Sequence, residues 1–547
     1  MSDDKNTPDP KAHEAASPQA PPNPKRWWAL AAIALGVSLI IMDATVVNVA
    51  LPVVIRDLSL TATQAEWMNA VYSLMFAALL LASGRAGDIW GRRRLLIIGL
   101  LVFVAASLLA GASGSAATII GARLLQGIGA SLMLPSTLST LNAMFQGRER
   151  AIAFAVWGST IGGMAAMGPL VGGWLTTDAS WRWAFWMNVP IGAVVLALTL
   201  WAVPQTRDET GGRSLDVVGA LLSATGLGLI VYALIEGEHF GWWLQTSGAL
   251  SPVPILLAVG AFVVVVFVLY QRRRVRAGLH VLVDLHLFGI RSFRYGAIAA
   301  LVVALGEFGL LFTLPLLLQN ALGYTALGTG WLIVALAGGT FLISGATPQL
   351  TQRIGPRAVV RTGLALEAVA VAGLALTVSS HMASLGVAGW LFLYGLGVGM
   401  ATAQLTSVIL IDVPVHQSGQ ASGLQSTVRQ LGSSLGVALL GTLLIVSLGA
   451  FTSDRLDQAG VPADQADGIS LAVRDSLGGV IPSLEASDTT RMAGEAASAA
   501  LIDATRVTTG VASLIILGGL AATLALPRDP RPRRRDEAYA ESGATST

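Results

Sequence analysis

The sequence predicts an all-α polytopic membrane protein, and three observations support this fold class. Only 12% of the 547 residues are charged, whereas a soluble domain carries roughly 25% charged residues. Hydrophobic residues make up 54% of the chain, and they gather in runs of about 20 residues, long enough for a helix to cross a ~30 Å hydrocarbon core. The runs lack the alternation of outer-membrane strands. Most of the surface is therefore expected to face lipid.

Fourteen apolar runs are predicted to span the membrane as helices. Their even number places both termini on one side. They cover 27–51, 65–83, 95–113, 117–141, 150–175, 183–203, 215–236, 252–271, 293–318, 327–350, 358–378, 383–408, 420–449 and 504–526.

The positions of the basic residues predict the orientation. Most of the 34 Lys and Arg residues lie in the tails or in connections on the side of the termini. Because cationic loops resist translocation, both termini are predicted to be cytoplasmic and the membrane to be the inner (plasma) membrane. The acid-rich segment 451–503 is then outside, and Asp488 suggests a helix start within a short helical hairpin there. The outer segments hold only Arg56, Arg182, Arg455, Arg474 and Arg491.

A faint internal repeat predicts the domain organisation. Gly84–Arg94 follows the second run and Thr347–Arg357 follows the tenth, and each predicts two helices joined by a tight turn. Parallel six-helix repeats are one plan of secondary transporters. The predicted parts are a disordered cytoplasmic tail (1–26), a six-helix half (27–203), a linker with two extra helices (204–292), a second six-helix half with the loop 451–503 (293–526), and a basic cytoplasmic tail (527–547).

Five segments of the sequence resemble signatures of one transporter family. Residues 84–94 resemble the loop signature of the major facilitator superfamily, and 121–129 resemble its signature with a membrane-embedded arginine. Residues 168–173 are similar to the antiporter signature. Residues 42–52 and 181–192 resemble signatures of the fourteen-helix drug:proton antiporter branch, the multidrug efflux type. The resemblance spans the chain from the first predicted helix to the thirteenth.

This resemblance implies a proton-coupled secondary active exporter of small amphipathic or cationic drug-like compounds, working by alternating access. Its partners would be these substrates, protons and lipid, and no nucleic acid. It would use the proton motive force, with no cofactor, no metal and no enzymatic activity. It would act as a monomer. The same machinery would serve a dedicated exporter of an endogenous antibiotic, siderophore or lipid. Three other classes of protein fit less well. The sequence lacks the signature of a proton-coupled peptide importer, the soluble signalling domain of a membrane sensor and the clustered catalytic residues of a membrane enzyme.

Three carboxylates fall well inside the predicted spans, away from their ends: Asp43, Glu307 and Glu367. A charge at membrane depth costs at least ~2.5–3.5 kcal/mol, so such residues are functional candidates. Asp43 and Glu307 are the predicted proton-coupling acids, whereas Glu367 is open between a functional and a structural role. The resemblance implies that Arg123 tunes a nearby acid, since a guanidinium does not shed its proton.

Two further sets of residues are predicted to take part in the conformational change: a gating loop and a bend in the fifth span. Asp88 is expected to bind arginines in a gating loop whose charge network holds the two halves together on the cytoplasmic side. Proline and glycines are expected to let the fifth span bend and pack closely. The gating loop comprises Gly84, Asp88, Gly91, Arg92 and Arg93, and the antiporter helix bend comprises Gly168, Pro169, Gly172 and Gly173.

A substrate cavity is predicted from aromatic and amide side chains in or beside the spans. Aromatic rings stack on flat or cationic ligands, and amides adapt to several hydrogen-bonding patterns. The candidates are Trp67, Asn69, Tyr72, Gln126, Gln319, Asn320, Gln404 and Gln425.

Overall fold

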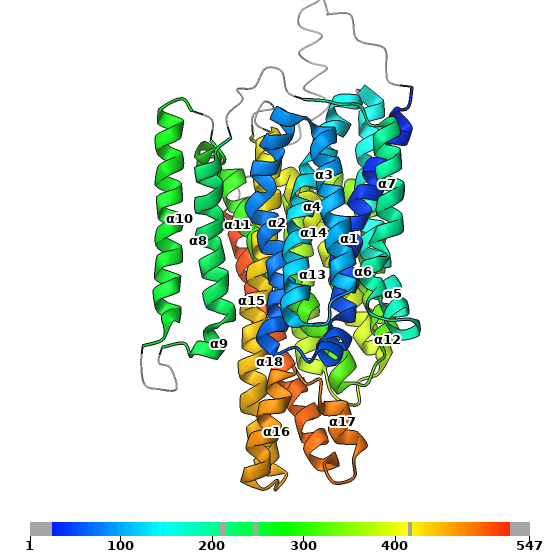
Figure 1. The fold of residues 1–547 in the computed structure, drawn as a ribbon, viewed down its shortest axis with the longest axis vertical. Helices are drawn as coiled ribbons and strands as arrows, with labels where there is room; N and C mark the ends of the chain where they lie inside the picture. Colours follow the sequence, from blue (N-terminus) through cyan, green and yellow to red (C-terminus); the bar gives the residue numbers. More distant parts are fainter. Residues whose placement is uncertain are drawn as a thin grey trace, which may run out of the picture.

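The computed structural model describes residues 24–145, 147–207, 215–243, 250–279, 281–413 and 418–525. They form an elongated bundle of helices (Figure 1). Thirteen helices of this described part are long and apolar enough to cross a membrane. The helix α5 (Gly147–Asp178), whose side chains are described only in part, is a further long member of the bundle. The predicted all-α membrane fold is confirmed; nearly all of the two predicted tails lies outside the described residues.

The helices of the first half begin where the sequence supplies capping residues. Thr61 and Gln64 form a reciprocal capping box at the start of the second helix, and Ser115 and Thr118 do the same for the fourth. The helices are α1 (Arg26–Leu58), α2 (Ala62–Trp90), α3 (Arg92–Gly111), α4 (Ala116–Met144), α5, the short α6 (Trp183–Trp186) and α7 (Asn188–Ala202).

The two extra helices form a pair at the side of the bundle (Figure 1). They are α8 (Val217–Ile235) and α10 (Pro252–Arg276), with the short α9 (Gly237–Phe240) after α8. The α8 helix packs against α2 and α15, and α10 packs against α8. Asp216 accepts a hydrogen bond from Gly219 N at the start of α8, and Gln271 of α10 donates to the same carboxylate over 2.6 Å. This carboxylate therefore ties the pair together.

The second half contains two helices that are longer than predicted. The α15 helix continues to Gln458 and α18 begins at Arg491, so the hairpin between them contains only α16 and α17. Asp488 lies before α18 and pairs with Arg491 over 2.7 Å. The elements are η2 (Leu285–Gly289), α11 (Arg291–Leu316), η3 (Leu317–Ala321), α12 (Ala326–Ile354), α13 (Pro356–Thr377), α14 (Ser384–Leu410), α15 (Ser418–Gln458), α16 (Ala463–Asp475), α17 (Ile481–Ala486) and α18 (Arg491–Leu524).

The predicted helix–turn–helix repeat is present in both halves. Gly91 joins α2 to α3 with φ 104°, and Gly355 joins α12 to α13 with φ 85°. A side chain at these φ values would strain the backbone, so both turns require glycine. Gln352 occupies the position in the second turn that Asp88 occupies in the first. The α2–α3 turn defines the Gly91 end of the bundle, and α16 and α17 define the opposite, hairpin end.

The two halves are sealed against each other toward the hairpin end. Val49 of α1 lies in one buried cluster with Leu314, Leu318 and Ala326 of the second half. Thr177, near the end of α5, accepts a hydrogen bond from Leu327 N over 3.0 Å. Apolar packing and backbone contacts therefore close the bundle on this side.

Candidate functional site

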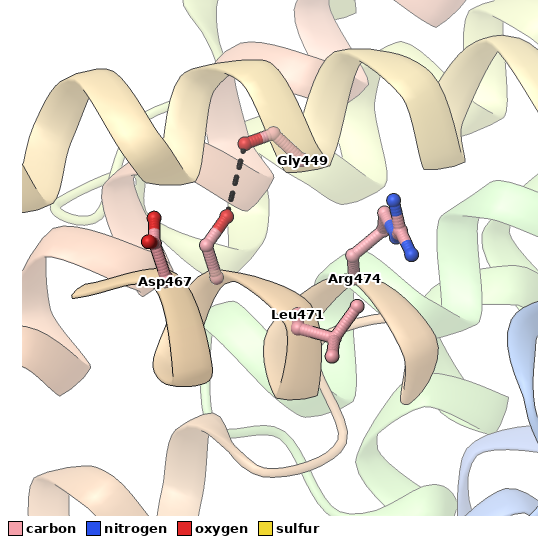
Figure 2. A pocket seen from close by; sticks show the side chains of 5 residues that line it. Gly449, Asp467, Leu471 and Arg474 are labelled. Carbon is pink, nitrogen blue, oxygen red and sulfur yellow. Dashed lines mark hydrogen bonds between the residues drawn. The ribbon is translucent and has the colours of Figure 1, made fainter. Parts of the chain in front are cut away.

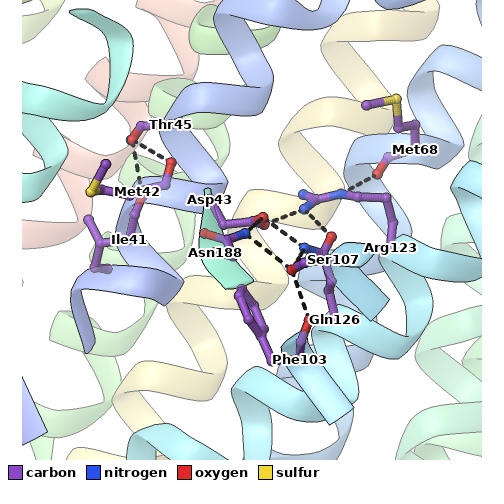
Figure 3. A network of polar contacts seen from close by, with 10 residues as sticks. All are labelled: Ile41, Met42, Asp43, Thr45, Met68, Phe103, Ser107, Arg123, Gln126 and Asn188. Carbon is purple, nitrogen blue, oxygen red and sulfur yellow. Dashed lines mark hydrogen bonds and ion pairs between the residues drawn. The ribbon is translucent and has the colours of Figure 1, made fainter. Parts of the chain in front are cut away.

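Asp43 and Arg123 form a buried ion pair in the first half (Figure 3). The Asp43 side chain on α1 is 0% exposed and that of Arg123 on α4 is 2% exposed, and their closest atoms are 2.5 Å apart. Arg123 Nε donates to Met68 O over 3.2 Å, and the guanidinium carbon lies 4.3 Å from the centre of the Tyr72 ring. The structure therefore brings together the predicted acid and arginine.

Three further side chains complete the hydrogen-bonding network around Asp43. The Gln126 amide donates to Asp43 Oδ1 over 2.8 Å, and the Asn188 amide donates to the same oxygen over 3.0 Å. Ser107 Oγ accepts from both amides, over 2.9 Å and 3.2 Å (Figure 3). Helices α1, α3, α4 and α7 thus converge on one carboxylate. Ser107 and Asn188 were not among the predicted site residues, although each is a polar residue in an apolar run.

The geometry makes the charge of Asp43 a determinant of helix packing. Its two oxygens accept from Arg123, Gln126 and Asn188, so the network suits an ionised carboxylate. A proton on Asp43 would remove the charge that compensates Arg123, and a buried unpaired charge is strongly unfavourable. Proton binding at this site therefore favours a rearrangement of the four helices.

Glu307 forms a second and more open ion pair in the second half. Its carboxylate on α11 lies 3.4 Å from the Arg429 guanidinium on α15, and the two side chains are 14% and 38% exposed. Also on α15, Gln425 donates to Thr406 of α14 over 2.7 Å, and Gln404 of α14 is half-buried. Asp43 and Glu307 therefore belong to separate clusters.

Several residues predicted to line a cavity lie in helix interfaces in the described structure. The Trp67 indole donates to Glu236 over 2.9 Å, toward the extra pair of helices. The Gln319 amide donates to Val49 O over 2.9 Å. Asn320 accepts from Arg56 over 2.9 Å and donates to Leu477 O over 3.1 Å. Gln319 and Asn320, both in η3, thus contribute to the seal at the hairpin end. Asn69 is buried, Tyr72 covers Arg123, and Gln126 belongs to the Asp43 network.

The predicted gating loop is bound to other helices of the first half. Asp88 pairs with Arg92 over 2.8 Å, and Arg92 also donates to Ser139 O of α4 over 3.2 Å. Arg93 donates to Leu200 O of α7. A Cβ on Gly91 would overlap the side chain of Gln205, and Gly84 packs against Pro135. These contacts fix the loop to α4 and to the segment at the end of α7.

The glycines of α5 permit close approach to two helices. A Cβ on Gly168 would overlap Thr45 of α1, and one on Gly172 would lie 2.9 Å from Val46 Cα. A Cβ on Gly173 would lie 2.6 Å from Ala326 O of α12. Pro169 lies within α5, and its carbonyl oxygen would be 2.5 Å from a Cβ on Gly330. The α5 helix therefore links the two halves.

Two features lay outside the predictions. Glu66 of α2 is fully buried, and one of its carboxylate oxygens would be 2.2 Å from a Cβ on Gly441 of α15. Glu66 is the second residue of the predicted span 65–83, at its very end, and it was not among the predicted site residues. A pocket lies between α15 and α16, where Ser470 donates to Gly449 O over 3.3 Å (Figure 2). This pocket, also lined by Asp467, Leu471 and Arg474, belongs to the hairpin rather than to the helices around Asp43.

Comparison with known proteins gives consistent matches over most of the chain. The family model of the Major Facilitator Superfamily matches residues 33–437. The chain is 37% identical to a puromycin resistance protein, pur8, of Streptomyces alboniger, over 83% of this chain and 88% of that protein. It is 34% identical to the multidrug efflux pump LfrA of Mycolicibacterium smegmatis, over 91% of this chain and 95% of that protein.

One solved structure supports the fold independently. It is a bacterial homolog of the human lysosomal transporter Spinster, in an inward-facing and unoccupied conformation. The TM-score is 0.60, with 17% sequence identity over 92% of this chain and 98% of that chain.

Proposed function

Because this chain belongs to the Major Facilitator Superfamily, we propose that it is a proton-coupled antiporter. Its proposed task is to export small amphipathic or cationic drug-like compounds by alternating access. The observation that carries the proposal is the buried Asp43–Arg123 pair, an ionisable group at membrane depth tied to four helices. The two relatives described above are named for antibiotic resistance and multidrug efflux.

The proton-coupling step uses the two acids in different ways. Asp43 is enclosed and held by three donors, so its protonation changes how α1, α4 and α7 pack. Glu307 is partly exposed beside Arg429 and is accessible to a cationic substrate or to a proton. An antiporter requires this competition, because one carboxylate charge attracts either cation. Arg123 then sets the affinity of Asp43 for a proton.

Alternating access requires the seal at the hairpin end to open and the Gly91 end to close. The seal consists of the Arg56–Asn320 hydrogen bond, the Gln319–Val49 hydrogen bond and the close crossing of α5 and α12. All three contacts join the two halves. We assign the Gly91 end to the cytoplasm, in agreement with its basic loops.

A dedicated exporter of an endogenous antibiotic, siderophore or lipid is a narrower form of the same proposal. A susceptibility panel in cells with and without the gene separates the two. A broad exporter lowers susceptibility to several unrelated cations, whereas a dedicated one protects against a single compound class.

Transport by purified protein in proteoliposomes tests the proposed function. With ethidium as the probe cation, an imposed pH gradient is expected to drive its accumulation, and a protonophore is expected to abolish it. Ethidium movement that is indifferent to the pH gradient would reject proton coupling. No movement of any of a panel of amphipathic cations and neutral drugs would reject drug export.

A further inference from the structure

Glu367 is a fully buried carboxyl group on α13, outside the two ion pairs described above. It is 0% exposed. Among the residues that the structure describes, neither carboxyl oxygen has a hydrogen-bond partner. The hydroxyl of Tyr394 on α14 is also buried, and it too lacks a partner in this part of the chain. Two unsatisfied polar groups on adjoining helices are unusual, because buried polar groups are nearly always hydrogen-bonded.

The packing of α13 on α14 shows that this burial is built into the fold. A Cβ on Gly397 of α14 would lie 2.6 Å from Glu367 Cγ, and a Cβ on Gly363 would lie 2.8 Å from Gly397 O. The two glycines therefore let the helices cross closely beside the carboxyl group. An ionised carboxylate without donors is far more costly here than a neutral carboxylic acid. The geometry thus favours the protonated form.

Glu367 lies beside the helices of the open ion pair of the second half. Its chain neighbour Ala368 lies in one buried cluster with Leu310 of α11, Tyr394 of α14 and Leu440 of α15. Glu307 precedes Leu310 by three residues on α11, about one helical turn. On α18, Ser513 donates to Ala368 O over 2.9 Å. Also on α18, the Arg506 guanidinium donates to Val378 O at the end of α13 over 2.7 Å and to the Asp503 carboxylate.

The position of Glu367 parallels that of the Asp43 network in the first half. The Gly91 and Gly355 turns relate α2–α3 to α12–α13, and α4 and α14 follow in the same order. The first network draws side chains from α1, α3, α4 and α7. The second cluster draws them from the corresponding α11, α13, α14 and α18, and also from α15, which carries Arg429. Each half therefore carries its own buried acid.

We infer that Glu367 is a second proton-binding site of the transport cycle, one that holds its proton in the state described here and exchanges it with Glu307. The inference rests on the proposed proton coupling. In the exchange, the Glu367 O–H bond breaks as an O–H bond forms on the Glu307 carboxylate, either directly or through water, so one proton moves and no redox partner is needed. Glu307, with 14% of its side chain exposed, is the more accessible of the two acids and would pass the proton toward water. Tyr394 is the donor available to Glu367 once the proton has left.

Infrared spectroscopy of the purified full-length protein tests whether Glu367 is protonated and exchangeable. The wild type is expected to show the carbonyl band of a protonated carboxylic acid at neutral pH, and Glu367→Gln is expected to lose it. Glu495→Gln, at an exposed position in the hairpin end of α18, is the matched control and keeps the band.

Exchange in D₂O tests the route. The band is expected to shift upon deuteration, and Glu307→Gln is expected to slow this shift by roughly 100-fold, the scale of a positioned proton-transfer group. A band unchanged in Glu367→Gln, a band that never exchanges in D₂O, or exchange in Glu307→Gln as fast as in the wild type would overturn the inference. These measurements need no transported substrate. Failure of ethidium transport by the wild type would reject the proposed function separately.

Discussion

At the residue scale, the structure explains how a charged pair is tolerated at membrane depth. Asp43 and Arg123 are compensated by each other, and Gln126 and Asn188 supply the remaining donors. Buried pairs of this kind contribute little net stability, but breaking one by removing a single partner is costly because the other charge is left uncompensated. This asymmetry makes the pair suited to a proton-sensitive switch.

We therefore predict strong non-additivity between the two charges. Asp43→Asn and Arg123→Gln are each expected to lower the free energy of unfolding by about 3–5 kcal/mol, because each leaves a buried charge. The double variant is expected to be less destabilised than the sum of the two. Thermal unfolding of the purified protein in detergent measures this through the melting temperature. Strictly additive losses would show that the pair is not coupled.

Sequence reasoning identified the charged residues of this network but not all its partners. A charge in an apolar run is conspicuous because its burial is costly, so Asp43 and Arg123 were found. Ser107 and Asn188 cost less to bury and do not stand out. Their roles depend on which helix faces meet, and this is set by packing across the bundle.

At the element scale, α5 provides the link between the halves. Its glycines bring the backbone of α5 against α1 and α12 without intervening side chains. The predicted close packing is thus explained by specific crossings, at Gly172 against Val46 and at Gly173 against Ala326.

Gly173→Leu is expected to open the hairpin-end seal. The added side chain meets Ala326 backbone, and overpacking of this kind costs typically ~1–3 kcal/mol, which shifts a two-state equilibrium roughly 5- to 150-fold. A cysteine placed at the buried Leu318 of this cysteine-free chain should then react faster with an impermeant maleimide. Gly163→Leu is the matched control, because a Cβ there meets open space. Equal reactivity in both variants would contradict the assignment.

A separate prediction concerns the gating loop. Asp88→Asn weakens charge-assisted hydrogen bonds with Arg92, a loss of about 1.5–3 kcal/mol, and is expected to slow transport strongly. Ethidium binding should change little, because Asp88 lies in the loop and not among the cavity candidates. Gln352→Ala, at the equivalent position of the second turn, serves as the control. Loss of binding with normal cycling would exclude a gating role.

Helix positions followed from the sequence better than helix ends did. Apolar runs mark the spans, but α15 and α18 extend past them by turns in which exposed polar residues are mixed with buried ones. Hydrophobicity does not report such extensions, since they are stabilised by packing against α16 and α17. The contacts of the cavity candidates could not be predicted for a related reason: composition does not specify which face of a helix turns inward.

At the scale of the whole molecule, the bundle is sealed at one end by contacts between its halves. If the hairpin end is extracellular, a cysteine at the exposed Asp464 is expected to react with an impermeant reagent applied to intact cells. A cysteine at Gln352, which is exposed at the other end, is expected to react only after the membrane is permeabilised. The reverse pattern would invert the proposed orientation.

The central claim is that substrate binding displaces a proton from acids buried in this bundle. Proton release on adding ethidium to the purified protein in weakly buffered detergent solution measures it directly. The account predicts release from the wild type and none from the variant that combines Asp43→Asn with Glu307→Gln. Proton release of wild-type size from this double variant, with ethidium still bound, would contradict it.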